Sequence, residues 1–599
     1  MRLIGMLLFL STVLAGGMLA QTSTNSDLDA RRKALNDLLT EQWEYRLRTS
    51  PEFATIIGDK RYNDRLDDNS QKAIDDDLEQ TRRFLTRFEA IDTTGFPDQE
   101  ALNKSLMVRE LQRTLDGARF KPWEMPVNQF SGIHLHLPQL VTLLPFTDVK
   151  DYEDYISRLK QVPRVFQEEM EQMQKGMHDG LMPPKFLLEK VVTQAQAIAD
   201  MPAEKTPFAQ PLQKFPSSIS AENQRRLHDA VIEQIQMSVL PSYAKFIKFV
   251  KEDYAPKGRT EPGVWSLPDG ADRYAWAVKQ VTTTDLTPEE IHQLGLKQVA
   301  EIETQMLAIA QKLGYSDIKS LNSAIDNDPK LHDRLYAHSR EQILDLYRQH
   351  IDQMWQKLPE LFGRLPKAKL EVRPIEEFRE KQAATHYNPG TPDGSRPGHV
   401  MVNTSDFEHR KLITVESTSY HEGVPGHHMQ ISIAQEMPDL PPFRQHGFFI
   451  AYVEGWALYS ERLGKDVGFY QDPYSDYGRL QDEMLRAIRL VVDTGFHYKK
   501  WTRQQVVDFF HAHSDTDEPD VQSETDRYIA WPGQALGYKI GQLEILELRD
   551  RANKELGPHF DIRAFHDEVL GAGALPLDVL EQRIDHWIAD QKKSARLGM

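Results

Sequence analysis

The 599-residue sequence contains no cysteine. It therefore has no disulfide, no thiolate ligand for a metal and no lipobox cysteine to acylate, so any metal must be bound by histidine and carboxylate side chains. Basic residues are the minority among the charges, since 72 Lys and Arg stand against 90 Asp and Glu, which gives a formal charge of −18. A nucleic-acid partner is not expected, because phosphate binding requires clustered positive charge.

Long apolar runs are confined to the N-terminus. Arg2, the apolar stretch Leu3–Leu14 and small residues up to Ala20 are typical of a secretory signal. We therefore predict a signal peptide at residues 1–20 and a periplasmic or secreted protein, with an uncleaved N-terminal anchor as the alternative. No later run of about 18 apolar residues occurs, so no stable membrane insertion is expected after cleavage.

Apolar residues recur at helical intervals through most of the mature chain, for example over Ala30–Leu47. Pro122–Pro145, which is rich in proline, histidine and aromatic residues, is expected to be irregular. The Pro- and Gly-rich stretch Ala255–Tyr274 is expected to connect an N-terminal helical half, residues 27–254, to a half that carries the chemistry, residues 275–599.

Local signals define a few elements more closely. Thr287 with Glu290 three residues later predicts a capped helix start. Lys367–Val372 and His399–Asn403 alternate in character and predict short strands. The sequence thus indicates a mainly α fold with a small β element, formed by one large catalytic domain of residues 21–599.

The densest chemistry lies in the stretch TVESTSYHEGVPGHHMQ, which contains His421, Glu422, His427 and His428. Imidazole nitrogens bind zinc, and a nearby free carboxylate can deprotonate a water at the metal. On a straight helix the six-residue spacing from His421 to His427 leaves the two side chains about 120° out of phase. His428 restores the phase, but it lies about 10 Å further along the axis.

The residues between the two histidines offer a solution. Gly423 and Gly426 relax the backbone, and Pro425 cannot donate a hydrogen bond to the carbonyl of His421. A kink or a wide π-type turn would therefore let His421 and His427 bind one ion. His428 stays open as the alternative second ligand.

A third ligand is expected from Phe448–Gly464, an apolar helical stretch that contains Glu454 and Glu461. A carboxylate on such a stretch is costly unless it is paired or bound to metal. We assign Glu454 as the third ligand, and Glu461 and Glu416 as candidates to orient a histidine ring. The competing interpretation is a hydrogen-bonded polar cluster that binds no metal.

The motifs HExxPGHH and EGWALYxE resemble the signature of the bacterial domain-of-unknown-function-885 (DUF885) family. The resemblance covers nearly the whole mature chain, and its further matching stretches are Tyr387–Gly398, Arg489–His497 and Glu524–Gly541. This family is in turn similar to the gluzincin peptidases, such as angiotensin-converting enzyme and thimet oligopeptidase. The resemblance implies a large helical fold with a deep cleft, and one Zn²⁺ per chain bound by His421, His427 and Glu454 with Glu422 as the base.

The expected function is zinc-dependent hydrolysis of peptide bonds in short peptides, a metallopeptidase activity. The oxyanion needs a hydrogen-bond donor besides zinc, for which the candidates are Tyr538 first and then Tyr528 and His497. The candidates to bind a peptide's C-terminal carboxylate are Arg396, Arg527 and Lys539, all of which could instead form salt bridges.

Two other functions stay open. One is a zinc amidohydrolase that acts on non-peptide or cell-wall amides with the same residues. The other is a non-catalytic periplasmic binding protein. Glu422 beside His421 favours an enzyme, because a structural zinc site does not need a free carboxylate there.

Overall fold

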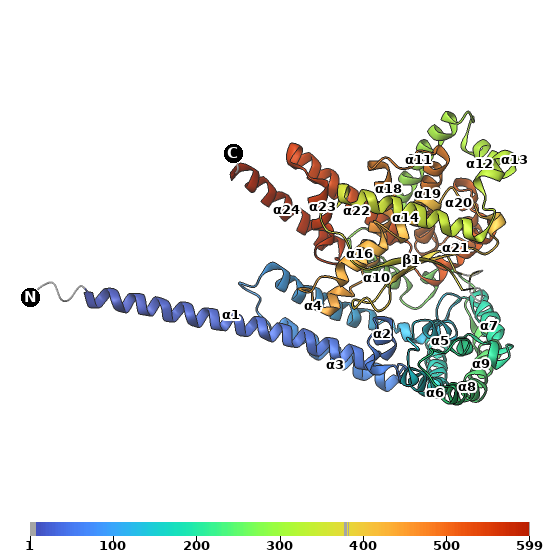
Figure 1. The fold of residues 1–599 in the computed structure, drawn as a ribbon, viewed down its shortest axis with the longest axis horizontal. Coiled ribbons are helices and arrows are strands. Elements are labelled where there is room, and N and C mark those ends of the chain that lie inside the picture. The colour runs from blue at the N-terminus through green and yellow to red at the C-terminus, as the bar shows by residue number, and fades with distance from the viewer. Residues whose placement is uncertain (1–6, 377–379, 381–382, 598–599) are drawn as a thin grey trace, which may run out of the picture.

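A computed structural model describes residues 7–376, 380 and 383–597, and it shows a mainly helical protein with one small sheet (Figure 1). The predicted fold class is confirmed. Helix α1 (Leu7–Thr49) projects from the rest of the molecule. Residues 1–6 of the predicted signal peptide lie outside the described residues. No helix in the described part of the chain is both long enough and apolar enough to span a bilayer.

The helices fall into two neighbouring groups (Figure 1). The first group contains α1 together with α2 (Pro51–Ile56), α3 (Gln71–Glu89), α4 (Asp98–Ala118), α5 (Ile133–Val141), α6 (Val149–Asp179), α7 (Lys185–Ala199), α8 (Ala221–Gln234) and α9 (Leu240–Phe249). The second group contains the other helices, of which those that precede the sheet are α10 (Gly270–Thr282), α11 (Pro288–Lys312), α12 (Ile318–Asn327), α13 (Pro329–Leu335) and α14 (Arg340–Leu361). Those that follow it are α15 (Val415–Glu422), α16 (His427–Gln435), α17 (Pro442–Gln445), α18 (Ile450–Asp466), α19 (Pro473–His497), α20 (Arg503–His513), α21 (Glu518–Ala530), α22 (Leu536–Leu556), α23 (Ile562–Leu570) and α24 (Leu577–Leu597).

The sheet has the strand order β1–β3–β2. Strand β1 (Leu370–Pro374) runs parallel to β3 (Gly398–Val402), and β2 (His386–Asn388) runs antiparallel to β3. Two of these strands, β1 and β3, lie at the two segments where the sequence predicts them. The chain passes directly from β3 toward α15, so the sheet lies beside the histidine motif.

Helix α11 shows how local chemistry defines an element. The Thr287 hydroxyl accepts a hydrogen bond from the Glu290 N–H, and the Glu290 carboxylate accepts one from the Thr287 N–H at 2.8 Å. These two bonds satisfy N–H groups that a helix start otherwise leaves without partners. Just after the end of the helix, Gly314 adopts a φ of +92°, a conformation that glycine reaches without strain. The predicted capped start is confirmed.

One segment differs from the prediction. Helix α5 lies inside Pro122–Pro145, which we expected to be irregular, although Pro138 falls in its middle. The side chains of Leu137, Leu140 and Val141 are buried in the core of the first group of helices. Burial of this apolar face outweighs the hydrogen bond that the proline removes, because packing commonly overrides local preference.

The two groups of helices are packed against each other. Helices α5 to α9 share a core of their own, but Leu106 of α4 and Leu187 of α7 are buried in clusters that belong to the second group. The second group is built on two closely packed helix pairs, α18 with α22 and α11 with α19. The large cleft described below lies between the two groups.

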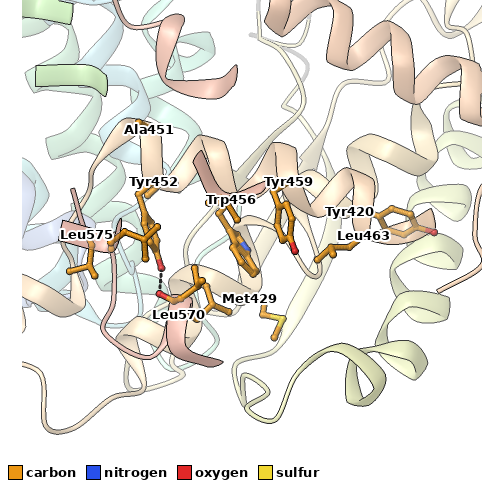
Figure 2. Packing of buried hydrophobic residues seen from close by; sticks show 14 of the residues in the cluster. Tyr420, Met429, Ala451, Tyr452, Trp456, Tyr459, Leu463, Leu570 and Leu575 are labelled. Atoms are coloured by element: carbon orange, nitrogen blue, oxygen red, sulfur yellow. Dashed lines mark hydrogen bonds between the residues drawn. The ribbon is translucent and has the colours of Figure 1, made fainter. Parts of the chain in front are cut away.

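Helix α18 anchors the second group. Its aromatic residues Tyr452, Trp456 and Tyr459 are fully buried and extend toward Met429 and Leu570 (Figure 2). Full burial of one large apolar side chain contributes about 1.5–3 kcal/mol. This packing fixes the position of α18 relative to α16. Helix α16 carries the second part of the histidine motif, and α18 carries the glutamates predicted to act with it.

An adjacent face of α18 meets α22 so closely that the two backbones are in contact. A Cβ atom on Gly455 would lie 2.4 Å from the Cα of Gly541, and one on Gly541 would lie 1.7 Å from the carbonyl oxygen of Ala451. Any side chain at these positions would separate the helices. Glycine is therefore required at both positions for the two helices to approach this closely.

Candidate metal centre

The helix that begins the histidine motif is broken in its middle. Helix α15 ends at Glu422, α16 begins at His427, and the Val424–Pro425 peptide bond between them is cis. The Pro425 carbonyl accepts a hydrogen bond of 2.8 Å from the indole N–H of Trp456. The predicted kink is therefore present, but the chain leaves the helix here and does not form a π-type turn.

The break brings backbone groups very close together. A Cβ atom on Gly426 would lie 1.9 Å from the carbonyl oxygen of His421 and 2.4 Å from that of Tyr420. One on Gly423 would lie 2.7 Å from the Ser419 carbonyl oxygen. Two consecutive turns can fold back on each other only because these two residues lack a side chain.

We expect Gly426→Ala to displace His427 from His421. The added methyl group collides with backbone, which cannot rotate away as a side chain can, and strain of this kind typically lowers the free energy of unfolding by about 1–3 kcal/mol. Thermal unfolding with and without added zinc measures the effect, and the variant should lose most of the zinc-induced rise in Tm. An unchanged rise would show that the break does not position the histidines.

The break turns both imidazoles toward one carboxylate. One nitrogen each of His421 and His427 and one oxygen of Glu454 lie within 4.8 Å of one another. Glu454 Oε2 is 3.6 Å from His421 Nε2 and 3.5 Å from His427 Nε2, and all three side chains are largely buried. These two nitrogens and one oxygen are the donor types that zinc prefers, at separations that an ion at ~2.0–2.2 Å from each donor can span.

The polar balance of this cluster also fits a cation. Glu454 Oε2 is buried and makes no hydrogen bond to another described residue. Although burial opposes the charge, the nearby imidazoles of His421 and His427 hold the pKa of Glu454 well below its usual value. Burial likewise opposes protonation of His421, but the adjacent carboxylates of Glu454 and Glu461 raise the pKa of His421 to about 10. The carboxylates thus attract positive charge to this position, which a bound cation would supply.

Glu461 lies behind the cluster on α18. Its Oε1 is 2.8 Å from Nδ1 of His421, so the ring is held with Nε2 directed at Glu454. The hydroxyl of Tyr470 donates to the Glu461 carbonyl at 2.7 Å, and Arg486 lies 3.7 Å from the carboxylate. Glu461 therefore occupies the orienting position that the sequence predicts for it.

We expect Glu461→Ala to weaken zinc binding by roughly 10–100-fold, because the ring of His421 then loses the acceptor that sets its orientation. Glu461→Gln keeps an acceptor oxygen and should lose less. Competition with a fluorescent zinc chelator gives the dissociation constants. Equal affinities in the wild-type protein and the alanine variant would contradict this role.

Two other candidates lie elsewhere. Glu416 accepts hydrogen bonds from the Tyr420 hydroxyl at 3.1 Å and the Tyr470 N–H at 3.0 Å, and from Ser475. It contacts no histidine ring through these bonds, so its suggested role in orienting a ligand is not supported. Its contacts instead join α15 to the segment before α19.

His428 is also turned away from the cluster. Its Nδ1 lies 3.0 Å from the hydroxyl of Tyr387 in β2, and its Nε2 lies 3.2 Å from the carbonyl oxygen of Ala368. Burial lowers the pKa of His428 to about 4, so the ring is neutral. The alternative of His428 as the second ligand is therefore wrong in this structure, because both ring nitrogens are already engaged on the side of the sheet.

Glu422 lies at the edge of the cluster, on the last residue of α15. Its Oε2 is 4.0 Å from Nε2 of His427, and its side chain lines the cleft. The cleft has a volume of about 1960 Å³ and is lined by both groups of helices, from Phe53 in α2 to Tyr538 in α22. The cluster of His421, His427 and Glu454, together with Glu422, is thus accessible to a large ligand.

The remaining predicted residues divide into two sets. Arg396, Arg527 and Tyr538 line the cleft, and Arg527 donates a hydrogen bond of 3.1 Å to the Tyr538 hydroxyl. Arg396 donates a hydrogen bond of 2.8 Å to the carbonyl of Ile56, the last residue of α2.

The other set does not reach the cleft, which corrects three predictions. His497 accepts from the Val264 N–H and donates to the Tyr528 carbonyl, so both ring nitrogens are used by backbone. The hydroxyl of Tyr528 is buried against Glu524. Lys539 is paired with Glu483 at 2.6 Å. These three residues stabilise the packing of α19, α21 and α22, and we assign them no contact with substrate.

Two cleft residues were missed. Arg486 and Arg489 line the cleft from α19. Both are buried charges on a mostly apolar helix, which is the same signal that identified Glu454 on α18. Applied to the RAIRLVV stretch, that criterion would have found them.

The fold and the site together define a mainly helical protein with a potential His₂Glu metal centre and an adjacent carboxylate in a large cleft. The chain belongs to the bacterial family DUF885, described as a bacterial protein of unknown function, which matches residues 51–584. No curated protein matches the chain. Solved structures are also similar to it, among them the following two.

One is a "putative lipoprotein from Colwellia psychrerythraea", which is 30% identical with a TM-score of 0.88 over 94% of this chain and 100% of that one. The other is a "putative lipoprotein of unknown function from Shewanella oneidensis", at 17% identity and a TM-score of 0.69 over 92% of this chain and 99% of that one. The second likeness concerns the fold alone.

These comparisons correct the predicted localisation. We expected a periplasmic or secreted protein, on the basis of a signal-like N-terminus and the absence of cysteine. Both of these solved structures are of proteins described as putative lipoproteins. The prediction of a periplasmic or secreted protein conflicts with these descriptions and is wrong.

Proposed function

We propose that this protein is a zinc-dependent hydrolase that cleaves peptide bonds in short peptides. The observation that carries the proposal is the position of Glu422, an acidic side chain 4.0 Å from the ligand nitrogen of His427 and open to the cleft. A purely structural metal site would not need a further carboxylate at that point. The gluzincin resemblance supports the same assignment.

The residues present divide the chemical work. His421, His427 and Glu454 would bind Zn²⁺, which polarises a carbonyl group and acidifies water. Glu422 takes a proton from the attacking water and returns it to the leaving amine. Tyr538 lines the same cleft, and its oxygen already accepts a hydrogen bond from Arg527. Its own O–H is thus available to donate to the oxyanion of the tetrahedral intermediate.

The size of the cleft favours a peptide over a small amide. Pockets for small molecules usually measure about 300–1,000 Å³, whereas this cleft measures about 1960 Å³. An extended peptide of several residues fills such a space, while a single acylated amino acid would leave most of its contacts unused.

Two measurements test the proposal. Elemental analysis of protein purified without a His tag should give about one zinc per chain, which is the stoichiometry of a single His₂Glu site. A mixture of short peptides, followed by mass spectrometry, should be cleaved by the zinc form and spared after chelation. A protein that binds no zinc after reconstitution, or binds zinc but cleaves no peptide in a diverse library, would overturn the proposal.

A further inference from the structure

Three arginines gather in one wall of the cleft. Arg486 and Arg489 are one turn apart on α19, and Arg527 comes from α21. The guanidinium carbons of Arg489 and Arg527 lie 4.6 Å and 5.9 Å from the ring centre of Tyr538. The side chains of Arg486, Arg489 and Arg527 are only 13%, 5% and 19% exposed, respectively. A wall of this kind is costly to build, because like charges repel one another when they are withdrawn from water.

The carboxylates around them are shared. Glu524 accepts hydrogen bonds from both Arg489 and Arg527, at 3.0 Å and 3.2 Å. Arg486 is paired with Asp482 at 3.3 Å and approaches Glu461, which already holds the ring of His421. Few of the carboxylates around the three arginines are therefore bound by one arginine alone.

Their hydrogen-bonding capacity is also unfilled. Arg486 Nε, Arg489 Nη1 and Arg527 Nε are buried and have no hydrogen-bond partner among the residues that the structure describes. Buried donors without partners are rare in native proteins, and three in one cluster call for an explanation. A ligand with acceptor oxygens provides one.

We propose that Arg486, Arg489 and Arg527 form a subsite for a carboxylate of the substrate, in the first place the free C-terminus of the peptide. The inference rests on the proposed function and adds the substrate class. Guanidinium groups match the planar, two-oxygen geometry of a carboxylate. A side-chain carboxylate of Asp or Glu offers the same chemistry and is the alternative source.

The position of the subsite limits where the bond is cut. Glu461 Oε1 lies 2.8 Å from Nδ1 of His421 and 3.7 Å from Nη2 of Arg486. Arg486 therefore lies within roughly 9 Å of the metal-facing nitrogen of His421, and an extended peptide advances about 3.3–3.6 Å per residue. A C-terminal carboxylate bound here therefore lies no more than about three residues from the cleaved bond. The enzyme then removes short fragments from the C-terminal end of its substrate.

The test compares three forms of one peptide with the zinc-loaded protein: a free C-terminus, a C-terminal amide, and an amide whose last residue is Glu. We expect kcat/KM to be roughly 10–100-fold higher for the free acid than for the plain amide, because a charge-assisted contact is lost in the amide. A side-chain source would instead restore cleavage in the amide that ends in Glu. Mass spectrometry of the products shows how many residues are released.

Arg527→Gln identifies the residues involved. It should remove most of the preference for the free acid, measured as the ratio of kcat/KM for the acid to kcat/KM for the amide in the same variant. Arg527→Lys keeps the charge without the planar fork and should recover part of the preference. Arg503→Gln is the matched control, since Arg503 also pairs with a carboxylate, Asp526, but does not line the cleft.

Binding separates this inference from the proposed function. Calorimetric titration of the Glu422→Gln protein with the acid and amide peptides reports on the subsite without turnover. Tighter binding of the acid, lost in Glu422→Gln/Arg527→Gln, supports the subsite even if no peptide is ever cleaved. Equal binding and equal cleavage of all three peptides would overturn the inference and leave the peptidase proposal standing.

Discussion

Glu422→Gln should reduce peptide hydrolysis by roughly 10²–10⁴-fold, the range typical for loss of a general acid–base group. The amide that replaces the carboxylate has nearly the same shape, but it cannot accept a proton from water. Zinc content should not change, because the binding cluster consists of His421, His427 and Glu454. The loss should appear in kcat, with KM little affected, since Glu422 acts on the reacting atoms.

Glu416→Gln is the matched control. It makes the same substitution on the same helix, α15, at another buried carboxylate, and its amide oxygen can still accept from Tyr470. This variant should retain zinc and activity. A Glu422→Gln protein that stays as active as this control would rule out Glu422 as the base.

His427→Ala should remove zinc, whereas His428→Ala should retain it. The two residues are neighbours in sequence, but α16 directs the first at Glu454 and the second at Tyr387. Loss of a direct ligand is expected to weaken zinc binding by more than about 100-fold, which exceeds the usual effect of an outer contact. Activity should fall in parallel with zinc occupancy.

The two histidine variants also differ in their expected effect on stability. His428→Ala leaves the hydroxyl of Tyr387 without its buried partner, so it should lower Tm, by an amount that corresponds to about 1–3 kcal/mol. Elemental analysis and thermal unfolding of both variants thus separate a metal ligand from a structural histidine. Zinc lost from His428→Ala and kept by His427→Ala would reverse the assignment.

That histidines of the motif lie beside Glu454 was predictable from the sequence, because donor chemistry is local. The pairing of a histidine-rich motif with a glutamate on an apolar stretch leaves few ways to stabilise that carboxylate. The choice between His427 and His428 was not predictable. It depends on the backbone course through Gly423–Gly426. It also depends on the hydroxyl of Tyr387 and the backbone carbonyl of Ala368, which come from distant segments and contact the ring nitrogens of His428.

The cleft wall was harder to predict. His497, Tyr528 and Lys539 lie in stretches that match the family, and sequence alone does not separate residues matched for packing from those matched for chemistry. In the structure all three face inward between helices. Arg486 and Arg489 were overlooked because their helix resembles a core helix, and only the fold shows that one edge of it borders open space.

The close contact between α18 and α22 also determines how this protein can be redesigned. Gly455 and Gly541 admit no side chain, so a library that varies these helices along their shared face would yield mostly unfolded variants. Helix α18, which carries Glu454, and helix α22, which carries Tyr538, therefore behave as one rigid unit. New substrate preferences are more accessible through Phe53 or Arg396, which line the cleft from other elements, so that substitutions there leave the rigid unit unchanged.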